Sequence, residues 1–421
     1  MKRAFVQSVG TGTRADSDIT RLLVWSIRES HPDRIVWVVS RDSRRFADQL
    51  VAELNVSEEQ YEIAELSSIS NVEAIYRECR AVLRSLEQHG FTSDDIEVDY
   101  TSGTKAMTAG LVLAAATHHG GRLKYITGEY DSGIVVSGTE KEERIQPRKI
   151  WADERTQAAL NLCRALRFDA ASDLLKTIQP EWLGDYERGL VLGLTHVAHG
   201  YGAWDRFDYG RAKGELEKLL SLDVQELADF RPDASVLSRM VHLKAPQDVS
   251  AEAMPSLLGP DRLADVFNNA QRRLAEGRDD DALARLYRLT EMLAQWILFQ
   301  GYGVMTGNVD LSKVPEAFRS ALDGQRNREG KIQIGLDWDY QLLKAFEHRI
   351  GVAFSQERSI GVLLKKRNDS LLAHGVAPIQ RQDVDSLVRK LGELLRVEIP
   401  DFESRCDELE FPWRRPRRPG A

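Results

Sequence analysis

The sequence contains little cysteine, and its three residues, Cys79, Cys163 and Cys406, lie far apart. They match neither a zinc-ligand spacing nor a disulfide framework, so we expect three buried thiols in a reducing cytoplasm. Long apolar runs are also missing, because no stretch approaches the roughly 18 apolar residues of a membrane span. The first residues, MKRAFVQSVG, lack the apolar stretch and the cleavage site of a signal peptide. We therefore expect a cytoplasmic protein with no membrane partner.

An excess of positive charge is absent as well. The 57 Lys and Arg residues are outnumbered by 65 Asp and Glu residues, which gives a net charge of −8. This balance argues against a protein that coats nucleic acid by bulk charge, but it is compatible with a nuclease that has a local basic cleft. The strongest basic cluster comprises Arg414, Arg415, Arg417 and Arg418. We interpret it as a disordered, solvated tail, with an RNA-binding arm as the alternative.

The 421 residues are enough for two or three domains. Over the first 150 residues, strand and helix patterns alternate. Strands are expected at 4–9, 34–39, 61–66, 96–100 and 122–127, and helices at 20–28, 71–88 and 106–117. This alternation predicts βαβ units and a mostly parallel sheet. Residues 134–136 are expected to form a hairpin with 122–127, which would add antiparallel strands at or near the sheet edge.

From Ile150 onward the apolar residues follow helical spacing, with breaks near 232–235, 253–260 and 301–315. No clean repeat of 30 to 40 residues is found, although two helical pairs near 155–225 suggest one. The fold class expected for the whole chain is therefore an α/β domain followed by all-α regions.

A glycine-containing turn follows the first expected strand. Glycines allow close backbone approach, and the helix that follows offers free N–H groups to an anion. Gly10, Gly12 and Ala15 also fit the loose G-x-G-x-x-A dinucleotide pattern, so a nicotinamide-dependent enzyme is an alternative. The acidic residue expected after the second strand is not clearly present in Ser40-Arg41-Asp42. The candidate ligand-binding residues of this turn are Ser8, Gly10, Thr11, Gly12 and Thr13.

A second polar loop, DYTSGTKAM at 99–107, follows the strand expected at 96–100. Ligands bind at this end of the strands in open α/β sheets. The loop's hydroxyls, backbone amides and lysine suit phosphate oxygens, although the spacing is not that of a P-loop. A helix cap beside a solvated lysine is the alternative. The candidate ligand-binding residues here are Thr101, Ser102, Gly103, Thr104, Lys105 and Met107.

The order strand, D-x-T-x-G-T-K-x-M, helix resembles the signature of CARF domains, the sensors of cyclic oligoadenylate in type III CRISPR systems. Ser102 stands where that family usually has its first glycine, and a serine would be strained there if φ were positive. The resemblance covers about residues 1–148. It implies a Rossmann-like domain and a homodimer in which Ser8–Thr13 and Thr101–Lys105 of both subunits line one cleft. Cyclic tetra- or hexa-adenylate would then be an allosteric activator, and no cofactor is implied.

Near the C-terminus, Arg367 and His374 are seven residues apart, so they share a face if the segment is helical. Histidine moves protons near neutral pH, and arginine stabilises charge that builds on a phosphate. This pair suits phosphodiester cleavage by the ribose 2′-hydroxyl, which requires no metal ion. We find no carboxylate cluster that would hold one. The alternative is a solvated arginine beside a histidine that is followed by the capping residue Gly375.

The spacing of Arg367, Asn368 and His374 resembles the R-x(4–6)-H motif of HEPN ribonucleases. The segments 269–273 (NAQRR) and 284–291 (ARLYRLTE) resemble the first helices of HEPN domains joined to CARF sensors. The resemblance implies that two such pairs meet across a dimer and cleave single-stranded RNA. Arg367 would bind the scissile phosphate, His374 would act as general base or acid, and Asn368 would orient the pair. The products would carry a 2′,3′-cyclic phosphate.

We interpret the chain as a CARF–HEPN ribonuclease of a type III CRISPR system. The expected domains are a CARF domain at 1–148, helical linker at 149–258, HEPN domain at 259–400 and Arg/Pro-rich tail at 401–421. Arg288 and Glu291 are expected to form a structural ion pair, with support of the catalytic site as the alternative. A non-catalytic ligand-responsive regulator remains an alternative, as does a CARF domain that also cleaves its own cyclic ligand.

Overall fold

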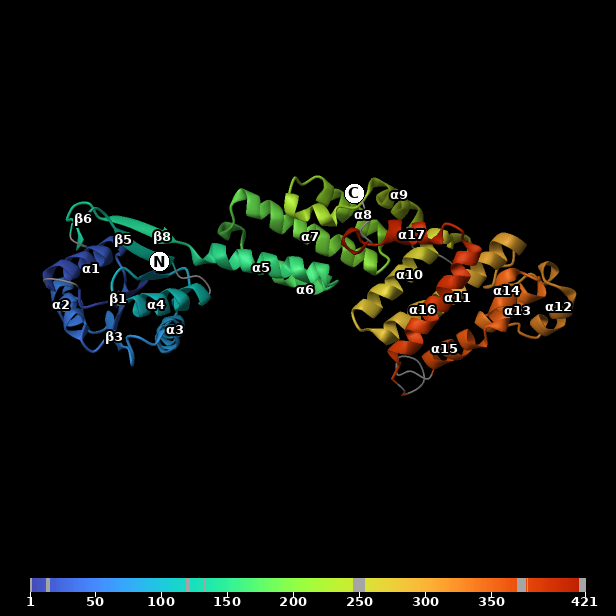
Figure 1. The fold of residues 1–421 in the computed structure, drawn as a ribbon, viewed down its shortest axis with the longest axis horizontal. Coiled ribbons are helices and arrows are strands. Elements are labelled where there is room, and N and C mark those ends of the chain that lie inside the picture. The colour runs from blue at the N-terminus through green and yellow to red at the C-terminus, as the bar shows by residue number, and fades with distance from the viewer. Residues whose placement is uncertain are drawn as a thin grey trace. The chain divides into compact units, whose positions relative to one another are not determined.

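The computed structural model describes residues 2–12, 16–118, 122–131, 134–244, 254–368, 376 and 378–415. The chain divides into two compact units (Figure 1). Unit 1 comprises Met1–Gln157 and Ile178–Gly184, and unit 2 comprises Ala158–Thr177 and Asp185–Ala421. None of the described helices combines the length and the apolar character that crossing a membrane requires.

Unit 1 is built on a six-stranded sheet with the order β3-β2-β1-β4-β5-β8. Neighbouring strands are parallel except for β5 and β8, which are antiparallel. This is the mostly parallel, Rossmann-like sheet that the strand and helix alternation predicts. The strands are β1 (Ala4–Val9), β2 (Arg34–Val39), β3 (Tyr61–Glu65), β4 (Ile96–Asp99), β5 (Arg122–Thr127) and β8 (Lys141–Ile145).

Helices cover both faces of this sheet, because alternate residues of each strand point to opposite sides (Figure 1). Phe5, Trp37 and Val39 pack with α1 (Asp16–Ser30) and α2 (Arg44–Leu54). On the other face, residues such as Val6 and Val98 pack with α3 and α4. Those two helices span Val72–Gln88 and Lys105–Thr117. The β1 strand is buried along its whole length, as expected for the centre of such a sheet.

The expected hairpin between 122–127 and 134–136 is wrong. Instead, β6 (Tyr130–Asp131) pairs with β7 (Ile134–Val135) as a separate two-stranded ribbon. The antiparallel partner of β5 is β8, which the sequence pattern did not predict. The reason is that β8, KEERI, is mostly exposed and carries no apolar alternation. An ion pair links β8 to β5, because Glu142 Oε1 lies 2.5 Å from Nζ of the buried Lys124.

The described part of unit 2 is almost entirely helical. Several of its helices pack as consecutive antiparallel pairs, as in other helical folds with short connections. Its helices are the end of α5 (Pro147–Arg164), α6 (Phe168–Leu175), α7 (Asp185–Asp205), α8 (Tyr209–Leu220), α9 (Ala234–Leu243), α10 (Pro260–Ala275), α11 (Asp279–Tyr302), α12 (Glu316–Asp323), α13 (Leu336–Ala345), α14 (Arg349–Gln356), α15 (Arg358–Asn368), α16 (Arg381–Glu398) and α17 (Phe402–Leu409).

One turn recurs between helices at four described places in unit 2. A residue with φ near +60° to +70° ends the first helix, and the next N–H donates to the carbonyl five residues earlier. This is the Schellman arrangement. It joins α5 to α6, α7 to α8, α10 to α11 and α13 to α14, at Leu166, Phe207, Gly277 and Glu347 respectively. The suspected repeat near 155–225 coincides with the first two turns. The residue with positive φ is different in each of the four turns, so the repeated turn cannot be recognised from the sequence.

The expectation that the basic cluster at 414–418 lies in a disordered, solvated tail is wrong for Arg414 and Arg415, because residues 402–415 are ordered. They form α17 and a 3-10 turn (Pro412–Arg414). Phe402 and Phe411 are fully buried, and the Trp413 ring lies 4.7 Å from that of Tyr201. Apolar burial therefore holds this segment despite its arginines. Arg417 and Arg418 lie outside the described residues.

Of the three cysteines, Cys79 and Cys163 are buried and Cys406 is only partly buried. The expectation of three buried thiols therefore holds for two of them. Burial raises the pKa of the Cys79 and Cys163 thiols to about 12, so both remain protonated.

Candidate functional site

The loops that follow β1 and β4 touch each other through their backbones. A Cβ at Gly10 would lie 2.7 Å from the backbone nitrogen of Gly103, so only glycine fits there. The Gly10 N–H donates to Ser102 Oγ at 3.0 Å, and the Ser8 hydroxyl donates to the Ser102 carbonyl. Because β1 and β4 are parallel neighbours, both loops lie at the same edge of the sheet. This edge is where open α/β sheets bind ligands.

Gly103, and not Ser102, takes the left-handed conformation in the second loop. The φ angle of Gly103 is +118°, whereas Ser102 is not among the described non-glycine residues with positive φ. A serine at 102 is therefore unstrained. Its hydroxyl also makes the contact to Gly10 that a glycine at this position would lack.

Asp99 fixes the start of the second loop from inside unit 1. Its fully buried carboxylate accepts hydrogen bonds from Gln7 Nε2 at 2.9 Å and Ser26 Oγ at 2.6 Å. It also accepts from the backbone and the hydroxyl of Thr101. Thr101 Oγ1 in turn accepts from the Ile126 N–H at 2.9 Å. The polar side chains of this motif are therefore satisfied within the fold, as buried polar groups require.

Thr104 caps the helix that begins at Lys105. Its Oγ1 accepts from the Met107 N–H at 3.2 Å, and it also donates to the Ile69 carbonyl. Lys105 is the exposed first residue of α4. Together, the helix N-terminus and the lysine favour an anion at this position.

The structure thus brings the two sequence-predicted loops together but gives their residues different surroundings. Ser8, Gly10, Ser102 and Met107 are buried, whereas Thr101 and Gly103 are partly buried. Thr11, Gly12, Thr104 and Lys105 are exposed. Thr13 lies outside the described residues.

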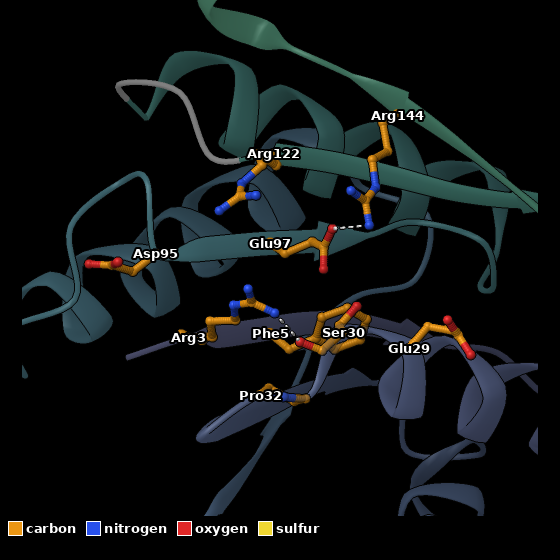
Figure 2. A pocket seen from close by; sticks show the side chains of 10 residues that line it. Arg3, Phe5, Glu29, Ser30, Pro32, Asp95, Glu97, Arg122 and Arg144 are labelled. Carbon is orange, nitrogen blue, oxygen red and sulfur yellow. Dashed lines mark hydrogen bonds and ion pairs between the residues drawn. The ribbon is translucent and has the colours of Figure 1, made fainter. Parts of the chain in front are cut away.

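A small cavity of about 90 Å³ lies at the opposite edge of the sheet, where β1, β4 and β5 begin (Figure 2). Its lining includes Arg3, Glu97 and Arg144. These groups already have partners, because Arg144 pairs with Glu97 at 3.7 Å and Arg3 donates to the Ser30 carbonyl at 3.2 Å. None of the residues predicted to bind a ligand lines this cavity.

In unit 2, Arg367 lies in the last turn of α15, beside α11. Its guanidinium carbon is 5.1 Å from the centre of the Tyr287 ring, a cation–π contact. Burial raises the pKa of Tyr287, and the carboxylate of Glu291 raises it further, so the phenol remains neutral. Asn368 is the last residue of α15, but its side chain lies outside the described part, as does the whole of His374.

Next to Tyr287 on α11, Arg288 and Glu291 form the expected ion pair at 3.0 Å. Facing them is Asp339 of α13, which the sequence analysis did not single out. Its carboxylate is fully buried, and neither oxygen has a hydrogen-bond partner in the part of the chain that the structure describes. Burial raises the pKa of Asp339 well above its usual value; Glu291 raises it further and Arg288 opposes the shift.

One sequence signal could have identified Asp339. It lies four residues before the buried Leu343 and directly before the buried Tyr340, so it is an acid on the apolar side of a helix. Elsewhere, across the described ranges, no group of three or more His, Cys, Asp or Glu residues is placed to hold a metal ion.

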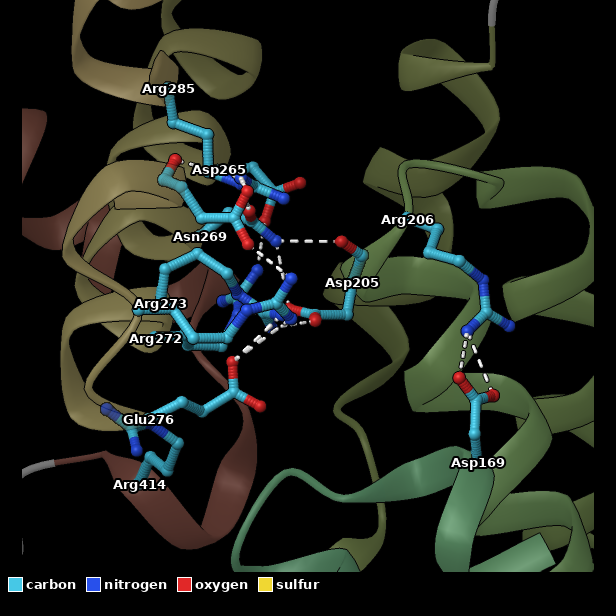
Figure 3. A network of polar contacts seen from close by, with 12 residues as sticks. Asp169, Asp205, Arg206, Asp265, Asn269, Arg272, Arg273, Glu276, Arg285 and Arg414 are labelled. Atoms are coloured by element: carbon cyan, nitrogen blue, oxygen red, sulfur yellow. Dashed lines mark hydrogen bonds and ion pairs between the residues drawn. The ribbon is translucent and has the colours of Figure 1, made fainter. Parts of the chain in front are cut away.

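The segment 269–273 forms part of a buried ion network (Figure 3). Arg272 is fully buried and pairs with Asp205 at 2.9 Å, Asp265 at 3.4 Å and Glu410 at 3.2 Å. Arg273 also pairs with Asp205. These contacts join α7, α10 and the segment after α17, so we assign the two arginines a structural role.

Comparison with known proteins finds matches that extend over both units. Residues 259–398 match the family described as Csm6 HEPN domain. The CRISPR system endoribonuclease Csm6 of Thermus thermophilus is 27% identical over 439 residues, which cover 96% of this chain and 87% of that protein. The structure of Enterococcus italicus Csm6 bound to cyclic hexa-2′-fluoro-hexa-dAMP has the same fold, with a TM-score of 0.62 at 13% identity. That match covers 97% of this chain and 98% of the other.

These matches are consistent with the fold described above, in which a mostly parallel sheet with paired loops is followed by a helical unit. Residues 259–398 match the Csm6 HEPN domain family, and over nearly its whole length the chain is similar to CARF–HEPN ribonucleases of CRISPR systems.

Proposed function

We propose that the protein is an endoribonuclease that cleaves single-stranded RNA in CRISPR antiviral defence and is switched on by a cyclic oligoadenylate. The match of residues 259–398 to the Csm6 HEPN domain supports the nuclease half of this proposal. The related Thermus thermophilus protein is named as an endoribonuclease. The sensor half is supported by the paired loops at the carboxyl ends of β1 and β4.

The activator, cyclic tetra- or hexa-adenylate, binds over these loops. Thr11, Gly12 and Lys105 are exposed there and are available to phosphate and ribose oxygens. The buried residues, including Ser8 and Ser102, hold the loops in place. Lys105 supplies positive charge next to the free N–H groups that begin α4.

The single observation that carries the nuclease assignment is the position of Arg367, held against Tyr287 within the HEPN-matched region. Its guanidinium binds the scissile phosphate and stabilises the charge that develops on it. His374 acts as general base or acid toward the ribose 2′-hydroxyl, and Asn368 orients the pair. No metal ion takes part, and the products carry a 2′,3′-cyclic phosphate and a 5′-hydroxyl.

The active form is a homodimer in which two Arg367–His374 pairs form one composite site. The cyclic oligoadenylate activates it by binding the nuclease-competent state more tightly than the resting state. We assign the CARF domain to residues 1–148, the helical linker to 149–258 and the HEPN domain to 259–400.

The direct test is cleavage of a fluorescent single-stranded RNA in EDTA, with cyclic tetra- or hexa-adenylate present. Wild-type protein is compared with His374→Ala and with Arg367→Lys, which keeps the charge but loses the forked geometry of the guanidinium. We expect products with cyclic phosphate ends from the wild type, and a loss of at least about a hundredfold in rate for His374→Ala. Undiminished cleavage by His374→Ala would remove that residue from the mechanism. A folded dimer inactive with both ligands would favour a non-catalytic regulator.

A further inference from the structure

A pocket of about 400 Å³ opens between the α7–α8 turn, α10 and α11 in unit 2. Its volume lies in the range of pockets that bind small organic molecules. Three arginines line it, and no acidic residue does. The residues that carry the following argument are Phe207, Tyr209, Arg262, Ala284, Arg285 and Arg288.

The positive charge of these arginines is only partly neutralised. The Arg262 side chain donates hydrogen bonds to uncharged carbonyl oxygens, those of Leu243 and Leu257. Arg285 donates to the Asn269 side chain, visible in Figure 3, and to the Asp281 carbonyl at 2.9 Å. Its ion pair with the Asp281 carboxylate is long, at 3.7 Å. Burial lowers the pKa of Arg285, and the neighbouring Arg273 lowers it further. A half-buried cation in such surroundings favours an anionic ligand.

The pocket also has aromatic residues in its wall, and the Arg262 guanidinium carbon lies 5.8 Å from the centre of the Tyr209 ring. The rings of Phe207 and Tyr209 lie 6.4 Å apart, and the Tyr209 hydroxyl is fixed by Asp265 at 2.8 Å. Phe207 occupies the left-handed position of its turn, with φ +63°. Gly277 fills the same position in the α10–α11 turn without strain, so the Phe207 ring is held at a conformational cost. Positive charge beside aromatic rings is the combination that binds single-stranded nucleic acid.

The pocket adjoins the proposed catalytic residues along α11. Arg288 lines the pocket, and it directly follows Tyr287, whose ring holds Arg367. Consecutive Cα atoms are about 3.8 Å apart, so a single RNA strand can contact both positions. If the pocket bound a free small molecule, it would not need to lie next to Arg367.

We propose that this pocket binds one nucleotide of the single-stranded RNA substrate next to the cleaved bond. The base lies against Phe207 and Tyr209, and the phosphate lies at Arg285 and Arg288. This inference rests on the proposed ribonuclease function, because it assigns a substrate subsite to it.

Ala284 offers a test that removes no existing contact. It is exposed on α11 at the pocket wall, four residues before Arg288. In Ala284→Glu, the new carboxylate pairs with Arg288 and repels a phosphate, while repulsion from Asp280 and Asp281 offsets the small gain in helix stability. Ala284→Gln adds nearly the same volume without the charge, so it is the matched control. The probe is a nuclease-resistant 2′-O-methyl RNA, and its binding to the full-length protein is followed by fluorescence anisotropy.

We expect Ala284→Glu to weaken RNA binding by roughly tenfold and Ala284→Gln to weaken it far less. The slope of log affinity against log salt should fall in magnitude by about 0.7 for Ala284→Glu, the value for one lost phosphate contact on a single strand. A second variant, Phe207→Gly, removes the ring and also removes the conformational strain at the left-handed position of the turn. It should also weaken binding while the protein remains folded.

Equal RNA binding by wild type, Ala284→Glu and Phe207→Gly would overturn the proposal, whatever the cleavage assay gives. So would a loss of cyclic oligoadenylate binding, in place of RNA binding, in Ala284→Glu. Charge-sensitive RNA binding without cleavage by the wild type would support the pocket while rejecting the nuclease assignment. The two proposals therefore fail in different ways.

Discussion

The absence of a side chain at Gly10 allows the loops after β1 and β4 to meet. An added methyl group would lie 2.8 Å from the Cα of Gly103, and the backbone on that side cannot rotate away as a side chain would. We expect Gly10→Ala to lower the stability of unit 1 by about 1 to 3 kcal/mol and to weaken cyclic oligoadenylate binding. Thermal denaturation and isothermal titration calorimetry measure the two effects.

The matched control is Gly214→Ala in the interior of α8, where an added Cβ meets no atom within 4 Å. Alanine should stabilise that helix by about 0.5 to 1 kcal/mol. If Gly10→Ala kept wild-type stability and ligand affinity, the close approach of the two loops would not be required for folding or for ligand binding.

Asp339 gives a pH-dependent prediction. Because its pKa is raised in the folded protein, the folded state holds a proton that the unfolded chain releases. Its contribution to stability is therefore complete below the unfolded pKa of about 3.9, and it is lost as pH rises toward the folded pKa. Asp339→Asn removes this loss, so the Tm at pH 7 should rise, and the difference from wild type should shrink toward pH 4. Parallel Tm curves for the two proteins between pH 4 and 7 would contradict this account.

Among the candidate site residues, those that the sequence predicted belong to local motifs. Gly10, Ser102 and Lys105 are examples, because a strand, a turn and a helix start can be predicted from neighbouring residues. The sequence could not separate the exposed Lys105 from the buried Ser102, since burial depends on the other loop. Asp339 was missed because its burial beside Arg288 and Glu291 depends on the packing of α13 against α11, although an acid on the apolar side of a helix was a signal for it.

At the scale of elements, the repeated helix turn of unit 2 uses one backbone geometry with very different side chains. Gly277 and Glu347 hold the same left-handed position, with φ of +72° and +59°. A Cβ at Gly277 meets no atom within 4 Å, so its φ alone decides the outcome of a substitution. Glu347 is exposed, so its side chain contributes little burial.

We therefore expect opposite shifts from two exchanges in these turns. Gly277→Ala should destabilise unit 2 by about 1 kcal/mol, and Glu347→Gly should leave its stability unchanged or raise it by up to about 1 kcal/mol. Urea denaturation followed by tryptophan fluorescence measures both variants. A marked loss of stability in Glu347→Gly would show that the side chain, and not the turn, matters at this position.

The sequence predicted elements well where apolar residues form a continuous run or a helical periodicity, as in β1, β2 and α3. It failed for β8, which is mostly exposed and has no apolar alternation. The pairing of β8 with β5 instead includes an ion pair between Glu142 and the buried Lys124. The α2 helix was also missed, although Phe46, Ala47 and Leu50 follow helical spacing.

At the scale of the whole molecule, the buried network around Arg272 ties segments that are distant in sequence. Asp205, Asp265 and Glu410 come from α7, α10 and the segment after α17, yet all three meet one guanidinium. We expect Arg272→Ala to lower the stability of unit 2 by about 3 to 5 kcal/mol, because it leaves buried carboxylates without a cation. Chemical denaturation provides the measurement.

The comparison variant is Arg206→Ala, which removes an exposed pair with Asp169, seen beside the network in Figure 3. That loss should stay below about 1 kcal/mol. Similar losses for the two variants would mean that the buried network does not hold unit 2 together. No local pattern in the sequence could have predicted these contacts, whereas the predicted order of sensor and nuclease rests on two short motifs.

The most direct test of the account is whether a ligand on the sensor controls cleavage of RNA. The initial rate of single-stranded RNA cleavage is measured against the concentration of cyclic tetra- and hexa-adenylate, for wild type and for Lys105→Ala. We predict that one of the two ligands raises the wild-type rate, and that Lys105→Ala needs a higher concentration to reach the same maximal rate. A rate that neither ligand changes, or an activation curve that Lys105→Ala leaves unaltered, would contradict the account.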